Sequence, residues 1–151
     1  MMDAGQIQAW LHVAVVHVPV ILAPVSLYLL IRGKRTDSRE FLRLGHTLSV
    51  LVALTSAVAY FTGPTTVEWW QSLVEWDSGA IEDHGLWGRI SFTILALAGV
   101  GSVISVLAEI QEEKPHPWIF HGVVWLLTAG VLSLIWTSHL GGLLRRPELA
   151  F

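Results

Sequence analysis

Four apolar runs, each long enough to cross a lipid bilayer, constrain this sequence more than any other feature. They cover about residues 7–31, 44–63, 85–108 and 118–140. Inside lipid, the backbone N–H and C=O groups must be paired within the protein, so apolar runs of roughly 20 residues predict transmembrane helices. The composition agrees, because 53% of the residues are hydrophobic and only 14% are charged. We therefore expect an integral membrane protein.

The links between the runs are short, which predicts an all-α fold: one domain, residues 1–151, built as an antiparallel four-helix bundle. Pro19 and Pro24 are expected to kink the first helix, and Pro64 to end the second. Between spans two and three, Thr65 and Glu68 form a capping-box pattern ahead of a tryptophan-rich segment. That pattern predicts a short amphipathic helix at about residues 66–77, lying at the membrane interface.

The basic residues are distributed unevenly between the two ends of the predicted bundle. The links after spans one and three carry a basic cluster and Lys114, whereas the opposite side carries Arg89, Arg145 and Arg146. The basic cluster consists of Arg32, Lys34, Arg35, Arg39 and Arg43. Because basic loops stay in the cytoplasm, this bias predicts a bacterial inner-membrane protein with both termini outside. The acidic loop between spans two and three then also lies outside.

Composition and motifs exclude several function classes. The absence of cysteine removes disulfide frameworks, thiolate metal sites and covalent attachment of haem. No basic patch extends beyond the short cluster, so nucleic-acid binding is not expected. There is also no recognisable nucleophile, acid–base pair or phosphate-binding loop. Enzymatic activity is therefore uncertain, and an electron-transfer subunit is favoured over an independent enzyme.

Two histidines fall at matching depths near the predicted cytoplasmic face. With a helical rise of about 1.5 Å per residue, His46 lies about 4.5 Å from Arg43 and His121 about 6 Å from Pro117. Two imidazoles at one level on different helices can ligate a b-type haem axially, and Arg43 can pair with its propionates. The small residues Ser49 and Ala53 would leave room for the porphyrin. Hydrogen bonding of both histidines at the interface is the alternative.

A second group of histidines is expected near the outer face. It comprises His12, His17, His139 and, at the limit of the hydrocarbon, His84, with Arg89 as the propionate partner. His12 and His17 lie about 140° apart around a helix, so at most one of them can ligate a given haem. For His139, capping of the helix end before Gly141 is the alternative, and His84 is expected in an exposed loop.

These observations predict a b-type cytochrome that binds one or two haem b groups and transfers electrons at or across the membrane, with quinone as a further candidate ligand. Its partners would be other membrane subunits, or a soluble c-type cytochrome that docks on the acidic outer loop. Two alternatives stay open. One is a non-catalytic scaffold subunit of a larger membrane complex, and the other is a transition-metal protein that uses the outer histidines.

Short motifs at both ends of the chain carry a family resemblance. Leu11-His12 with Val16-His17-Val18-Pro19 resembles the His-Pro-x-x-x-His-Phe-Pro opening of a large group of uncharacterised bacterial four-helix membrane proteins, although Val13 stands where that group tends to have proline. Ser138-His139-Leu140-Gly141-Gly142 resembles its Gly-His-x-Gly-Gly ending. The resemblance implies an inner-membrane protein, and because some members occur beside or fused to cytochrome domains, it is consistent with haem binding.

Overall fold

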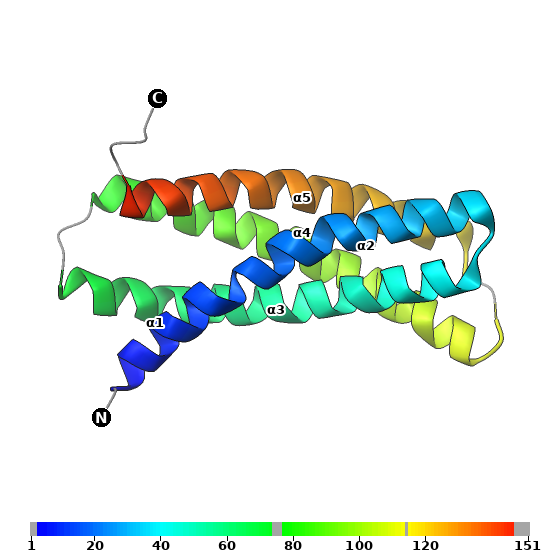
Figure 1. Ribbon diagram of the computed structural model, residues 1–151, viewed down its shortest axis with the longest axis horizontal. Helices are drawn as coiled ribbons and strands as arrows, with labels where there is room; N and C mark the ends of the chain where they lie inside the picture. The colour runs from blue at the N-terminus through cyan, green and yellow to red at the C-terminus, as the bar shows by residue number, and fades with distance from the viewer. Residues whose placement is uncertain (1–2, 74–76, 114, 147–151) are drawn as a thin grey trace.

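The computed structural model describes residues 3–73, 77–113 and 115–146, and all the regular structure in these ranges is helical. The elements are α1 (Ala4–Val15), α2 (His17–Thr36), α3 (Arg39–Gln71), α4 (Ser78–Ile110) and α5 (Pro117–Arg145). α1 and α2 follow one another end to end (Figure 1), so the five helices make four rods. Each rod is long and apolar enough to span a membrane. The predicted all-α membrane bundle is therefore confirmed.

The rods run antiparallel. Both termini and the α3–α4 connection lie at one end of the bundle, here called the termini end, while the α2–α3 and α4–α5 connections lie at the other, the hairpin end (Figure 1). α3 packs against α2 and α4, α4 against α5, and α5 against α2, which closes a four-membered ring. α1 packs mainly against α3. In Figure 1 it crosses α3 diagonally and diverges from α5.

Local capping explains where the helices begin. Asp3 accepts a hydrogen bond from the Gln6 backbone N–H at 2.7 Å, and Ser38 and Asp77 cap α3 and α4 in the same way. Such side chains satisfy backbone donors that have no partner within the helix. α2 ends at Thr36, and the residue that follows it, Asp37, has a left-handed φ of 51° and reverses the chain toward Ser38. The tight α2–α3 turn therefore follows from two adjacent residues.

The expected helix end at Pro64 is wrong, because α3 continues through this residue to Gln71. The separate interfacial helix expected at about 66–77 is corrected accordingly: its first turns belong to α3, and residues 74–76 lie outside the described ranges. A proline removes one backbone donor, and tertiary contacts on both sides can offset that loss. Here Thr62 and Trp69, which flank Pro64, pack against α1.

The first rod is interrupted at Val16, between α1 and α2. Pro19 is fully buried in the first turn of α2 and has no N–H to donate to the carbonyl of Val15, the last residue of α1. Pro24, by contrast, lies inside α2 without interrupting it. Of the two prolines expected to bend this rod, Pro19 therefore lies at the break.

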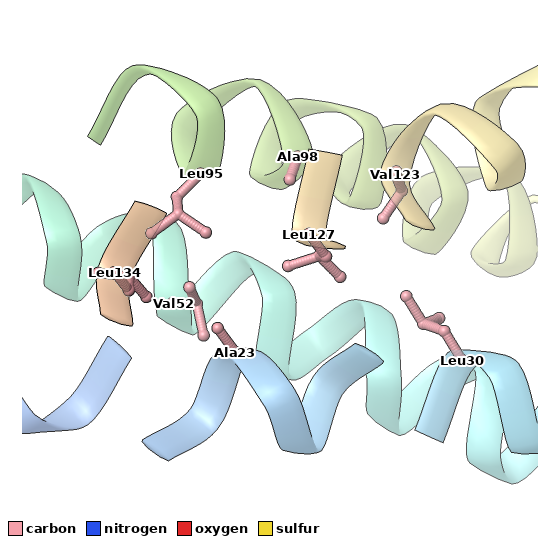
Figure 2. Packing of buried hydrophobic residues seen from close by; sticks show 8 residues of the cluster. All are labelled: Ala23, Leu30, Val52, Leu95, Ala98, Val123, Leu127 and Leu134. Atoms are coloured by element: carbon pink, nitrogen blue, oxygen red, sulfur yellow. The ribbon is translucent and has the colours of Figure 1, made fainter. Parts of the chain in front are cut away.

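A short apolar core and many small residues hold the rods together. Figure 2 shows the core cluster, which all four rods supply: Ala23, Leu30, Val52, Leu95, Ala98, Val123, Leu127 and Leu134. Between them the backbones approach closely. A Cβ added to Gly130 would lie 2.6 Å from Leu95 Cδ2, and one added to Gly99 would overlap the Cβ of Ala53. Small residues at helix crossings are the usual means of close packing in lipid, where dispersion forces drive association.

This packing predicts that Gly99→Ala destabilises the bundle. The added methyl group would force α3 and α4 apart, and overpacking of this kind costs about 1–3 kcal/mol. The free energy of unfolding in mixed detergent micelles measures the effect. Gly122→Ala is the matched control, because nothing lies within 4 Å of its added Cβ, and its higher helix propensity should leave the stability unchanged or slightly raised. Equal effects of the two variants would contradict the close α3–α4 approach.

Candidate functional site

His46 is the most buried histidine, with 7% of its surface exposed, and it lies in the hairpin half of α3. Its Nδ1 lies 3.2 Å from Ser102 Oγ on α4, and its ring meets Phe120 of α5 edge-on at 6.4 Å between centroids. The imidazole thus joins three rods. The preceding residue, Gly45, accepts a hydrogen bond from Ser26 of α2 through its carbonyl at 2.8 Å, so the fourth rod is fixed at the same level.

His121, the expected partner of His46, is exposed on α5. Its ring lies 5.5 Å from that of Phe120, which also contacts His46, so the two histidines occupy one level of the bundle as their depths predicted. However, the His46 ring points inward and His121 lies on the outer surface. The structure therefore does not bring these two imidazoles together as facing ligands.

The residues expected to leave room for a porphyrin beside His46 are used in helix packing. The Ser49 carbonyl and the Ala53 side chain both adjoin Gly99 of α4. Within the described ranges, the buried Ser49 hydroxyl has no hydrogen-bond partner. Arg43 is exposed and lines a surface hollow of about 170 Å³ together with Val106, Glu109 and Ile110. The space around His46 is therefore a packed interface with a polar centre.

His12 lies in the termini half, where it connects α1 to α3. Its Nδ1 is 2.8 Å from the Ala59 carbonyl oxygen and 3.2 Å from Thr62 Oγ1, and its Cε1 lies 3.6 Å from a Cβ built on Gly63. A carbonyl oxygen only accepts hydrogen bonds, so Nδ1 carries the proton and donates it to Ala59. In the neutral ring, Nε2 then retains its lone pair.

His84 repeats this arrangement between α4 and α5. Its Nδ1 donates to the Thr137 carbonyl oxygen at 3.1 Å, which again leaves the Nε2 lone pair free. A Cβ added to Gly141 would lie only 2.9 Å from the Cε1 of this ring, so His84 fits where α5 has no side chain. His84 and His12 are close enough to interact electrostatically. His12 on α1 and His84 on α4 are thus two half-buried imidazoles whose Nδ1 atoms are both held by backbone carbonyls.

The other predicted outer residues lie on the surface. His17 is exposed, and its Nδ1 donates to the carbonyl of Val13 in the preceding turn at 2.8 Å. His139 is exposed, with its ring 5.5 Å from Trp136. Arg89 is exposed as well. Among the residues that the structure describes, no group of three or more His, Asp or Glu side chains forms a polydentate metal site.

A cluster of hydroxyl groups lies beside His84 and was not predicted from the sequence. Ser91 Oγ lies 2.6 Å from Ser133 Oγ and 2.9 Å from Thr137 Oγ1, and Thr137 also supplies the carbonyl that holds His84. The sequence does carry a signal for it. Leu127, Gly130, Ser133, Thr137 and Gly141 recur every three or four residues along one face of α5. His139 falls two residues away from both Thr137 and Gly141, on a different face.

Comparisons with protein-family models, curated proteins and solved structures gave no match to this chain. The resemblance of its histidine motifs to the four-helix family therefore stays a prediction.

The contact between His46 and Ser102 predicts that Ser102→Ala destabilises the protein. The substitution leaves a buried imidazole nitrogen without its partner, at a cost of about 1–3 kcal/mol. Ser105→Ala is the matched control, since Ser105 is also buried on α4 but bonds only to the Gly101 carbonyl of its own helix. Unfolding in detergent micelles compares the two variants. A larger loss of stability in Ser105→Ala would argue against the interhelical bond.

Proposed function

We propose that this chain is a b-type haem protein of the bacterial inner membrane, in which His12 and His84 would hold the haem and which transfers electrons at the termini end. One observation carries the proposal: two half-buried imidazoles on different rods, which interact electrostatically, each donate their Nδ1 proton to a backbone carbonyl. Histidine ligands of metals characteristically make this bond, because it fixes the ring and raises the basicity of Nε2.

The donor chemistry of these residues fits a haem. Two neutral imidazoles occupy the two axial positions of a low-spin iron, and haem b needs no cysteine. When bound, the haem supplies a one-electron redox centre. The chain's own residues orient the donors: Ala59 holds His12, Thr137 holds His84, and Gly141 leaves the His84 ring its space. In this proposal His46 is structural, since its ring faces Ser102 and Phe120, and the chain binds a single haem.

The charge distribution supports an orientation and a kind of partner. The hairpin end carries the basic cluster defined above, so we propose that it faces the cytoplasm. Exposed acidic residues lie toward the termini end: Glu68, Asp77, Glu82 and Asp83. A soluble c-type cytochrome with a basic surface, or another membrane subunit, would dock there by charge complementarity. A quinone dissolved in the bilayer is the alternative exchange partner for electrons.

A scaffold role is the second candidate, and one observation favours it. His12 and His84 each connect two rods by hydrogen bonds, α1 to α3 and α4 to α5, and such bonds also stabilise a bundle that binds no cofactor. Isolation of the chain as a stoichiometric component of a larger assembly, without chromophore or metal, would support the scaffold. Metal without a haem spectrum would instead support a transition-metal site.

The haem proposal predicts a Soret band and, after reduction, an α band in the protein purified from cells supplied with haem. His12→Ala and His84→Ala should each abolish low-spin haem binding, because each removes an axial ligand. His121→Ala and His139→Ala are controls, as both side chains are exposed. Absorption spectra and haem content per chain provide the measurement. Loss of haem in the control variants alone, or no Soret band in the wild-type protein, would overturn the proposal.

A second pair of variants tests the same site without removing a ligand. Gly141→Ala places a methyl group against the His84 ring and should shift the spectrum or weaken haem retention. Gly142→Ala adds a methyl group with nothing within 4 Å and should leave both unchanged. If folded Gly141→Ala protein, verified by its helical circular dichroism, kept the wild-type spectrum, His84 would not be a ligand.

A further inference from the structure

A hollow on the outer surface of α2, at the hairpin end, is lined by Tyr28, Ile31, Arg32 and Arg35 and has a volume of about 190 Å³. These four residues follow one another at intervals of three, one and three, so they lie on a single face of the helix. The face combines an aromatic hydroxyl, an aliphatic side chain and two guanidinium groups. This is an amphipathic composition at the point where a transmembrane helix leaves the hydrocarbon.

The two guanidinium groups are available to a ligand. Arg32 and Arg35 are exposed, and within residues 3–73, 77–113 and 115–146 neither has an ion-pair partner. The neighbouring Lys34 differs, because its Nζ lies 5.7 Å above the centre of the Phe120 ring on α5. Two arginines on one helix face present several N–H donors that match the oxygens of a phosphate group.

An apolar surface leads away from the arginines along the same face. Ile21 and Val25 are 60% and 41% exposed, and Tyr28, at 63%, lies between them and Arg32. Residues 21, 25, 28 and 32 are again spaced by three or four, so they continue the face toward the middle of the bilayer. Tyrosine is enriched where the acyl chains meet the headgroups. Along α2 the exposed residues therefore change from aliphatic to aromatic to cationic. This order matches that of a phospholipid, whose acyl chains lead through the interface to its phosphate.

A second surface hollow at this end lacks this chemistry. It is lined by Arg43, Val106, Glu109 and Ile110, so it pairs one arginine with a carboxylate. A carboxylate repels a phosphate, whereas the residues that line the α2 hollow include no acid. The α2 hollow thus has a positive lining without an acid, in contrast to the hollow beside Arg43.

We propose that the hollow lined by Tyr28, Ile31, Arg32 and Arg35 is a binding site for one anionic phospholipid. Its phosphate lies against Arg32 and Arg35, and an acyl chain follows Tyr28, Val25 and Ile21. The proposal is independent of haem binding. A lipid bound here by both regions would hold the hairpin end at the membrane surface.

Native mass spectrometry of the detergent-purified protein tests the site, with phosphatidylglycerol as the probe and phosphatidylcholine as the zwitterionic comparison. We expect one phosphatidylglycerol to be retained in preference to phosphatidylcholine. The double variant Arg32→Gln/Arg35→Gln should weaken its retention at least tenfold, because two charge-assisted hydrogen-bonding groups are lost. Val25→Asn should weaken retention while keeping both arginines.

The matched control is Arg39→Gln/Arg43→Gln, which removes the same charge from the same end but leaves the hollow intact. It should retain the lipid at the wild-type level. Equal losses in the two double variants would mean non-specific attraction to a basic surface and would overturn the site. Release by millimolar inorganic phosphate, together with an unchanged Val25→Asn variant, would show a phosphate site without a lipid chain and would overturn it as well.

Discussion

Close approach of helix backbones through small side chains is the constraint on which the rest of this structure depends. In lipid, the surface of a rod and its interior are both apolar, so burial of hydrophobic residues gives little drive to assemble. The core cluster is accordingly small, and Gly33, Gly45, Gly99, Gly101 and Gly130 each lie where a Cβ would crowd a residue of a neighbouring rod. Such contacts bring neighbouring rods close enough for short polar side chains to form hydrogen bonds from one rod to the next.

That closeness gives the buried polar groups their partners. Ser26 reaches the Gly45 carbonyl, His46 reaches Ser102, and His84 reaches the Thr137 carbonyl beside Gly141. In each case a glycine or serine at the crossing permits the contact. His12 and His84 therefore acquire their tautomers from backbone carbonyls of neighbouring rods, and the free Nε2 of each ring follows from how α1 meets α3 and how α4 meets α5.

The sequence predicted the rods, their antiparallel order and the common level of His46 and His121, because each of these follows from the length of an apolar run and the helical rise. It placed His84 wrongly, in an exposed loop, whereas this residue lies half-buried within α4. It could not predict how each rod is rotated about its axis. The side of each helix that faces lipid and the side that packs against other helices are both apolar, so the sequence does not show which side is which. Two histidines at the same depth can therefore point in different directions. His46 and His121 do so. The glycine and serine positions do indicate which face of a helix is packed: Gly141 lies on the packed face of α5, and His139 does not.

The break at Val16 has a consequence for how the chain is assembled. The specific hydrogen bonds of α1 go to α3, from His12 to Ala59 and Thr62, which are 47 and 50 residues further along the chain. α1 is therefore synthesised well before the surface that holds it exists. Until α3 has entered the bilayer, the first twelve-residue helix has only its short contact with α2, across a proline-interrupted joint. α1 is therefore made before its binding surface on α3 and can take its final place only after α3 has been made.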